Sequence, residues 1–160
     1  MLSELETCIP ALRRYARALL GSRQDADDLV HDCLVRALDK LHTRRDGGDM
    51  RVWLFAIMHN VFVSQRRRSK LERAPMTDIT VESGQESAVL FRDVAREFRK
   101  LPEDQRQVML LVSVEDLSYA EAARVLRVPI GTVMSRLSRG RQRLRQVSQE
   151  DTRQTLRRVK

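Results

Sequence analysis

The 160-residue chain is poor in the residue types on which several functional classes depend. Aromatic residues make up only 4% of it, which argues against a single-strand nucleic-acid binder built from stacking platforms. Its two cysteines, Cys8 and Cys33, are too few and too far apart for a disulfide framework. Neither they nor His31 and His42 show the close Cys or His spacing of a metal site. We therefore expect no metal or other cofactor, and a structural, buried role for Cys33.

Long apolar runs and catalytic motifs are also missing. No stretch approaches the length of a membrane span, and residues 1–10 lack the basic flank and apolar centre of a signal peptide. No paired carboxylates, nucleophile motif or phosphate-binding loop can be assembled from the sequence. We expect a cytoplasmic protein that does not insert into membranes and is not an enzyme.

Positive charge, in contrast, is abundant. Lys and Arg together number 30 against 22 Asp and Glu, so the formal net charge is +8. Neutralising the phosphates of a nucleic acid releases its counterions, which makes a polyanion the favoured partner of so basic a chain.

The most informative segment is residues 117–145, which is typical of a helix-turn-helix. Ser118 and Glu121 have the spacing of a capping box, in which each side chain satisfies a free backbone N–H near the other. Pro129 ends the first helix because proline lacks an N–H and disfavours helical geometry in the residue before it. A second helix is predicted from about Gly131.

This second helix has two different faces. Its apolar stripe consists of Ile130, Val133, Leu137, Leu144 and Val147. Its polar and basic face consists of Thr132, Ser135, Arg139 and Gln142, flanked by Arg136, Arg143 and Arg145. A helix that buries one face and presents donors and charge on the other suits insertion into the major groove of DNA.

The rest of the chain reads as helix, and no strand-like alternation of useful length appears. Further helices are predicted over residues 10–20, 25–41, from Asp49 to about 70, over 87–101 and after Pro102. We predict an all-α fold of two small helical bundles joined by a flexible linker, with the helix-turn-helix in the second. The expected divisions are 1–70, a linker at 71–86, 87–147, and a polar tail at 148–160.

Helical spacing also predicts which side chains are buried. Leu38 lies on the apolar stripe of the second predicted helix, and Val94 lies on that of the helix at 87–101. On the helix after Asp49, Trp53 falls on the stripe and Phe55 does not. We therefore expect Trp53 to anchor the core and Phe55 to be the more exposed aromatic.

Charge is distributed unevenly over the first half. Asp28, Asp32 and Asp39 share the outward side of the second predicted helix with His31 and Val35. Such a face would repel DNA, so it is either merely solvated or meets a basic protein surface. The next helix reverses the sign, since it carries Arg51 and ends in the basic run at 66–70, which could meet phosphates.

The order of these segments resembles the extracytoplasmic-function (ECF) sigma factors of bacterial RNA polymerase, over roughly residues 9–145. The first half is similar to the family's region two through DADDLVHDCLVRAL and MRVWLFAIMHNVFVSQRRR. The second is similar to region four through LPEDQRQVMLLVSVEDLSYAEAARVL and VPIGTVMSRLSRGRQRLR. The resemblance implies a transcription initiation factor whose partners are core RNA polymerase, double-stranded promoter DNA with a melted minus-ten strand, and an anti-sigma factor.

The resemblance also implies a role for three sets of residues. Polymerase binding would fall to Asp28, His31, Asp32, Val35 and Asp39. Recognition and melting of the minus-ten element would fall to Arg51, Trp53, Asn60, Arg66, Arg67 and Arg68. The minus-thirty-five element would be contacted by Thr132, Met134, Ser135, Arg136, Ser138, Arg139 and Arg143.

Three positions depart from the family pattern, and two other functions stay open. His31 stands where relatives commonly carry glutamine, and Met134 and Ser138 stand where they often carry larger polar, basic or aromatic residues. The promoter sequence of a relative therefore does not transfer to this chain.

Two alternative functions stay open. One is a stand-alone helix-turn-helix regulator, which would not need the acidic face. The other is a sigma-like decoy for an anti-sigma protein, which would not need the basic recognition face.

Overall fold

The computed structural model describes the backbone of residues 1–44, 47–72 and 88–158. Within these ranges, the side chains of 71–72 and 88–93 and most of those after 146 are not described. All regular structure in the described part is helical, so the prediction of an all-α fold with two helical units is confirmed. The predicted linker at 71–86 lies almost entirely outside the described residues.

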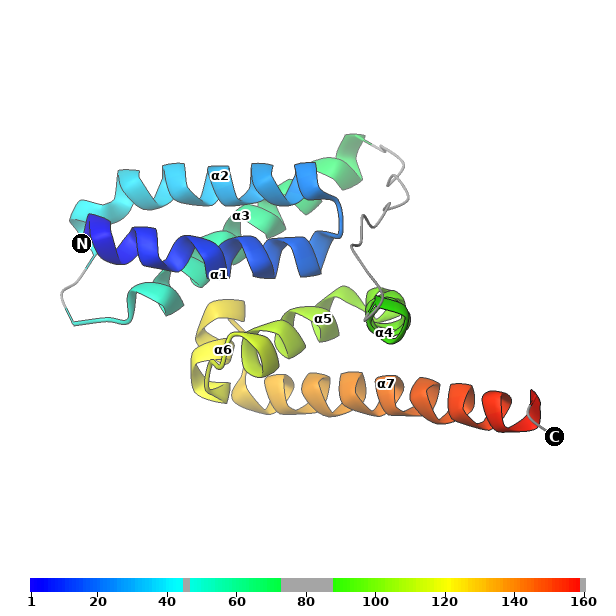
Figure 1. Cartoon of the computed structure of the whole chain (residues 1–160). Coiled ribbons are helices and arrows are strands. Elements are labelled where there is room, and N and C mark those ends of the chain that lie inside the picture. The colour runs from blue at the N-terminus through cyan, green and yellow to red at the C-terminus, as the bar shows by residue number, and fades with distance from the viewer. Residues whose placement is uncertain (45–46, 73–87, 159–160) are drawn as a thin grey trace.

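The first half is a bundle of three long helices (Figure 1). The helix α1 (Leu2–Leu20) lies antiparallel to α2 (Arg23–Lys40), and after the short 3-10 turn η1 (Leu41–Thr43) the helix α3 (Met50–Glu72) crosses behind both. Gly21 ends α1 with a φ of 73°, a left-handed conformation that glycine adopts without steric cost. The Ser22 hydroxyl then caps α2 by accepting from the Asp25 amide at 3.3 Å.

The second half consists of shorter helices and ends in the longest one. It contains α4 (Ala88–Lys100), α5 (Glu103–Met109), the π-helical turn η2 (Leu110–Val114), α6 (Tyr119–Leu126) and α7 (Ile130–Arg158). Figure 1 shows α7 running from beneath α6 to the far end of the molecule, with α4 crossing beside it. The helix α7 continues through residues 148–158, which the sequence assigned to a polar tail.

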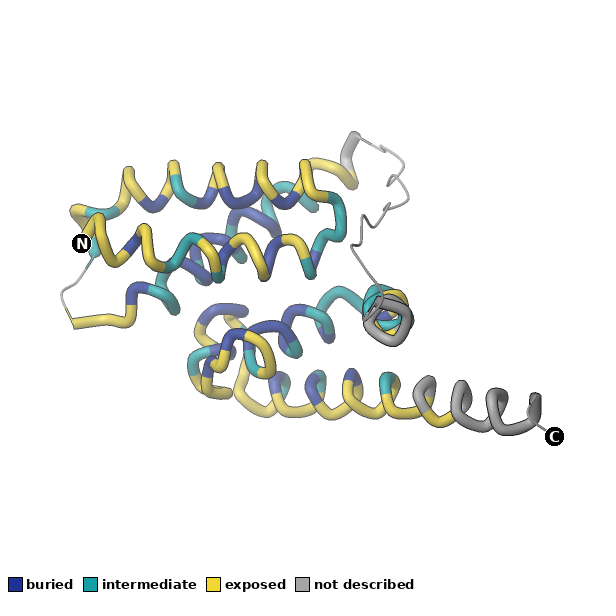
Figure 2. Tube along the Cα trace, in the orientation of Figure 1, coloured by how far each residue is buried: buried dark blue, intermediate teal, exposed yellow. Residues whose placement is uncertain are grey.

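The two halves share one apolar core. Leu12 and Leu54 of the first half and Leu111 and Val125 of the second are almost completely buried and belong to one continuous cluster. Figure 2 shows the buried positions of α1 and α3 turned toward those of α5 and α6. Each half alone is small for an autonomous core, so burial between them supplies support that neither has by itself.

Four expectations about the first three helices and α4 are wrong. The helix α1 does not begin at Pro10; it begins at Leu2, and Pro10 is exposed inside it. Leu38 and Val94 were expected in the core but are 51% and 48% exposed.

The fourth wrong expectation concerns the two aromatic residues of α3. Phe55 is 1% exposed, and its ring packs edge-on against Tyr15 at 5.2 Å between centroids. Trp53 is only half-buried. The face of α3 that contains Phe55 is covered by α1, and the arrangement of α1 over α3 was not visible in the helical period of α3 alone.

Candidate functional site

The helix-turn-helix is built as its capping residues predict. The Ser118 hydroxyl accepts from the Glu121 amide at 3.2 Å, and the Glu121 carboxylate accepts from the Ser118 amide at 2.8 Å. The carboxylate also accepts from the Ser118 hydroxyl at 2.8 Å, and the bonds that it accepts from the amide and the hydroxyl of Ser118 lower the pKa of Glu121. After α6, Arg127 adopts a left-handed φ of 54°, and Pro129 accepts the first backbone bonds of α7. The chain therefore turns sharply between the two helices, as a helix-turn-helix requires.

The helix α7 buries one face and leaves the other open. Val133 and Leu137 are 0% and 2% exposed. The helix comes so close to α5 at Gly140 that an added Cβ would lie 2.6 Å from the Met109 sulfur. Of the predicted minus-thirty-five residues, the exposed ones are Met134, Ser135, Ser138, Arg139 and Arg143. Thr132 and Arg136 are half-buried, and the Nε of Arg136 lies 3.3 Å from Oδ2 of Asp104 on α5.

The outer face of α2 is acidic and partly apolar. All five residues predicted to bind the polymerase are exposed on it: Asp28, His31, Asp32, Val35 and Asp39. Oδ2 of Asp32 accepts from Nε2 of Gln65 on α3 at 2.9 Å, which orients this carboxylate. Leu38 adds a second exposed apolar side chain, so the face offers both charge and apolar area.

The predicted minus-ten residues of α3 are not equally accessible. Arg67 and Arg68 are exposed, whereas Arg51, Trp53, Asn60 and Arg66 are half-buried. Nη2 of Arg51 lies 2.6 Å from Oε2 of Glu115, and Nη2 of Arg66 lies 2.8 Å from Oε2 of Glu103. Both acids belong to the second half of the chain, so this face is in contact with carboxylates.

Glu115 is the residue that the sequence reasoning missed. Its side chain is fully buried, and both oxygens accept from Arg14: Oε1 from Nε at 2.8 Å and Oε2 from Nη2 at 2.6 Å. The bonds to Glu115 raise the pKa of Arg14. The sequence contains only one indication that Glu115 is buried, namely its position directly after the apolar run LLVSV. Its partners Arg14 and Arg51 lie 101 and 64 residues away, so no local pattern reveals the pairing.

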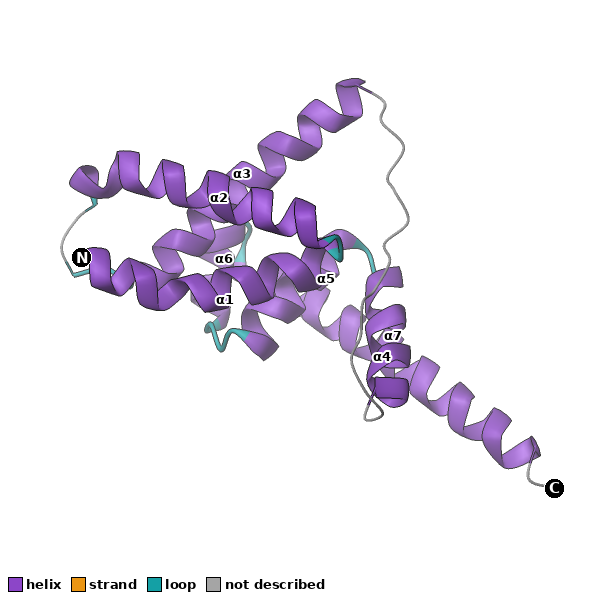
Figure 3. Cartoon of the chain, turned by 45° about the horizontal axis from the view of Figure 1, so that its top comes forward, coloured by secondary structure: helices purple, strands orange, loops and turns teal. Residues whose placement is uncertain are grey.

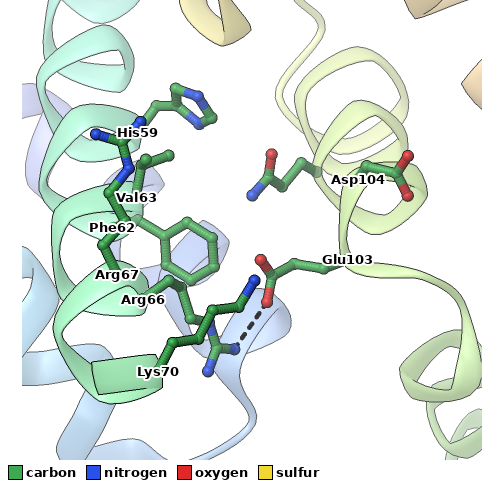
Figure 4. Close-up of a pocket in the computed structure, with 9 residues that line it drawn as sticks. His59, Phe62, Val63, Arg66, Arg67, Lys70, Glu103 and Asp104 are labelled. Carbon is green, nitrogen blue, oxygen red and sulfur yellow. Dashed lines mark ion pairs between the residues drawn. The ribbon is translucent and has the colours of Figure 1, made fainter. Parts of the chain in front are cut away.

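A cavity of about 300 Å³ opens where α3 faces α5. Figure 4 shows His59, Phe62, Val63, Arg66, Arg67 and Lys70 on the α3 side, and Glu103 and Asp104 on the α5 side. Arg66, Arg67 and Lys70 make the α3 wall cationic, and Glu103 points toward it from the α5 side. Burial lowers the pKa of His59, and the nearby charges of Arg127 and Arg136 lower it further.

Cys33 has the buried position expected of it. It is 0% exposed, its sulfur lies 3.6 Å from the carbonyl oxygen of Leu54, and burial raises the pKa of its thiol to about 12. Within the described residues, no group of three His, Cys, Asp or Glu side chains is arranged to hold a metal ion. Nor is any described helix long and apolar enough to cross a membrane.

Two family models match the chain, one on each half. The model described as the Sigma2 domain of PhyR matches residues 5–59, and the model described as Sigma-70, region 4 matches residues 91–144.

Curated relatives match over most of the chain. The ECF RNA polymerase sigma factor EcfG of Rhodopseudomonas palustris is 34% identical over 146 residues, which cover 88% of this chain and 81% of that protein. The ECF RNA polymerase sigma factor SigM of Mycobacterium tuberculosis is 33% identical and covers 83% and 69%.

Solved structures share the arrangement of helices. The sigma factor RpoE of Bartonella quintana, solved in complex with the anti-sigma factor NepR, superposes with a TM-score of 0.82 at 32% identity and covers 92% of this chain and 95% of that one. The anti-anti-sigma factor PhyR of the same organism, also complexed with NepR, gives a TM-score of 0.62 at 18% identity over half of its length, a likeness of fold alone.

Proposed function

We propose a role in transcription initiation for each of three surfaces of this chain. The proposal rests on the family: the chain belongs to the extracytoplasmic-function (ECF) family of RNA polymerase sigma factors. As an ECF sigma factor it binds core RNA polymerase and directs initiation at specific promoters. We assign it no catalysis of its own, because the polymerase carries out the chemistry, and we place it in the cytoplasm with that enzyme.

We assign minus-thirty-five recognition to α7. The observation that carries this is the helix-turn-helix with an open basic face, in which Arg139 and Arg143 are exposed while Val133 of the same helix is buried. Arginine forms paired hydrogen bonds with guanine and with phosphate, and an exposed methionine such as Met134 can contact a thymine methyl group. Thr132, Ser135, Arg136 and Ser138 complete the proposed surface.

We assign core polymerase binding to the outer face of α2. Asp28, Asp32 and Asp39 would meet a basic surface, and the exposed Val35 and Leu38 would supply apolar contact. His31 lies within the same face. This face would repel DNA, so its function is separable from that of α7.

We assign minus-ten recognition and strand melting to α3, through Arg51, Trp53, Asn60, Arg66, Arg67 and Arg68. The half-exposed Trp53 provides a surface for stacking an unpaired base, and the arginines provide charge for the phosphates. Residues 1–70 would thus form the polymerase and minus-ten unit, and 87–147 the minus-thirty-five unit.

Reconstituted run-off transcription with core polymerase tests the assignment. Arg139→Ala should reduce initiation that depends on the minus-thirty-five element and leave core binding intact. Asp32→Arg should do the reverse, and Glu6→Arg, a charge reversal on the exposed side of α1, is the matched control. Equal loss of core binding in both variants would contradict the division of faces, and failure of the chain to bind core at all would contradict the proposed function.

One finding favours a second candidate, a decoy that binds an anti-sigma factor in place of a sigma factor. The first half matches the model of the sigma-like domain of PhyR, which a structure describes as an anti-anti-sigma factor. A decoy would bind an anti-sigma protein without directing initiation. The exposed arginines of α7 favour a working sigma factor, itself regulated by an anti-sigma factor, and run-off transcription distinguishes the two.

A further inference from the structure

The cavity between α3 and α5 has the size and the lining of a small-molecule site. Its volume of about 300 Å³ is at the lower end of the range for such sites. Figure 4 shows the basic side chains of α3 on one side of it and the acidic side chains of α5 on the other, with the ring of Phe62 between them. The roles proposed for α2, α3 and α7 in initiation give this cavity no occupant.

Both carboxylates of the cavity already have a guanidinium partner. Nη2 of Arg66 lies 2.8 Å from Oε2 of Glu103, and Nε of Arg136 lies 3.3 Å from Oδ2 of Asp104. Each of these pairs is neutral as a unit. The charge that an occupant has to match therefore comes from the other cations of the lining.

These other cations are Arg67 and Lys70, which have no ion-pair partner among the described residues. His59 adds no charge at pH 7, because burial lowers its pKa below 6.5 and the charges of Arg127 and Arg136 lower it further. Two positive charges thus stay uncompensated at the cavity. A phosphate monoester matches them, since it carries about 1.5 to 2 negative charges at pH 7. A backbone phosphate of DNA is a diester with one charge and matches them only in part.

An uncharged polar side chain of the lining also lacks a partner. Gln107 lines the cavity and is only 6% exposed, yet its side-chain amide forms no hydrogen bond with the described residues. Buried polar groups in folded proteins nearly always have a partner, so this amide indicates a polar occupant. An amide donates and accepts, which suits the hydroxyl groups of a sugar or a similar body.

We propose that the cavity binds a small organic phosphate monoester, with its phosphate at Arg67 and Lys70 and its polar body at Gln107. Arginine and lysine both bind phosphate through charge-assisted hydrogen bonds. The apolar side chains of Phe62 and Val63 complete the lining and contact the carbon skeleton. This site goes beyond the proposed function, because binding at it requires neither DNA nor polymerase.

The test uses the free full-length chain and two probes at equal ionic strength. Ribose 5-phosphate is a monoester with a polar body, and dimethyl phosphate is a diester with one charge. Isothermal titration calorimetry at pH 7.5 measures both affinities, since the second ionisation of a monoester, with a pKa of about 6, is nearly complete there. The side-chain amide signal of Gln107 in ¹H–¹⁵N NMR spectra reports occupation of the cavity itself, and its loss in Gln107→Leu identifies it.

Two variants each remove one contact and have a matched control. Lys70→Gln should weaken binding of ribose 5-phosphate about fivefold, and Lys40→Gln, which removes the same charge from an exposed position of α2, should not weaken it. Gln107→Leu should also weaken binding about fivefold. Its control is Gln105→Leu, because Gln105 on the same helix is equally buried but does not line the cavity. If Gln107→Leu loses helical content by circular dichroism, Lys70→Gln decides.

We expect ribose 5-phosphate to bind at least about tenfold more tightly than dimethyl phosphate and to shift the Gln107 amide signal. Equal affinities for the two probes, no binding of ribose 5-phosphate, or an unshifted Gln107 signal would each overturn the proposal. So would equal affinities in Lys70→Gln and Lys40→Gln. Inorganic phosphate that binds as tightly as ribose 5-phosphate would overturn the assignment of an organic body to Gln107.

Discussion

The two basic faces of the molecule are in different states. On α3, Arg51 and Arg66 are paired with carboxylates of the second half. On α7, Arg139 and Arg143 are exposed and have no ion-pair partner among the described residues. Under the proposed function, the face on α7 is open to DNA, whereas Arg51 and Arg66 on α3 are already occupied by carboxylates. The two basic surfaces thus differ in what covers them.

The largest effect on stability is expected from a substitution in the apolar core that the two halves share. This core holds the second half against α3. Leu111 on η2 is fully buried, and Leu111→Ala should lower the free energy of unfolding by about 2–5 kcal/mol, through lost burial and the cavity left behind. Val114→Ala in the same turn is the control: Val114 is 45% exposed and should change stability by less than about 0.5 kcal/mol.

Urea unfolding followed by two probes measures this and tests the comparison. Circular dichroism reports on all helices, and the fluorescence of Trp53 reports on the first half alone. Coincident curves that shift together in Leu111→Ala would show that the halves unfold as one unit. If Leu111→Ala leaves the urea midpoint of Trp53 fluorescence unchanged but lowers the midpoint measured by circular dichroism, the halves unfold separately. The two basic faces would then be independent of each other.

The next effect compares one arginine from each face. Arg143→Ala should weaken binding of the free chain to duplex DNA by about tenfold, because a charge-assisted contact with phosphate is lost. Arg51→Ala should change the same affinity by less than about twofold, since Glu115 already occupies Arg51. Fluorescence anisotropy with a labelled duplex provides both values, and equal losses would show that the α3 face is as open as the α7 face.

The elements of this structure that depend on local sequence were predictable. The Ser118–Glu121 capping box, the break at Pro129 and the apolar stripe at Val133 and Leu137 all involve residues within a few turns of one another. Their geometry follows from the helical period and from free backbone groups, which a sequence displays directly. The acidic face of α2 was found for the same reason.

The elements that depend on distant packing were not predictable. Phe55 lies off the apolar stripe of α3, yet α1 covers it; Leu38 lies on the stripe of α2, yet nothing in the described part covers it fully. Glu115 would be read as a solvated acid, because its partners Arg14 and Arg51 are far away in the sequence. Helical period tells which residues share a face but not which neighbour lies against it.

A smaller effect concerns the α6 cap, which lies at the start of the helix-turn-helix. Ser118→Ala removes the hydroxyl that accepts from the Glu121 amide and should cost about 1 kcal/mol of stability. Ser135→Ala is the control, since that hydroxyl bonds to a carbonyl within its own helix and caps nothing. Thermal unfolding measures both; a loss above about 2 kcal/mol in Ser118→Ala would mean that the cap also supports contacts between the halves.

The smallest effect is a dependence of stability on pH through His59, which lies in the cavity between α3 and α5. Burial and the charges of Arg127 and Arg136 lower the pKa of His59 below its usual 6.5, although Glu103 and Asp104 also face this cavity. Between 6.5 and the lowered value, the unfolded chain holds more protons on His59 than the folded chain does. The free energy of unfolding should therefore fall as the pH drops below about 6.5, and level off below the folded-state pKa.

His59→Asn should remove this slope, whereas His31→Asn, on the exposed face of α2, should retain it. Urea midpoints between pH 7 and pH 5 measure the slope above the range in which Asp and Glu side chains ordinarily titrate. The result bears on the comparison of the two faces because protonated His59 adds a cation to the α3 wall, where Arg66, Arg67 and Lys70 already lie. A wild-type slope that survives in His59→Asn would assign the pH dependence to another group.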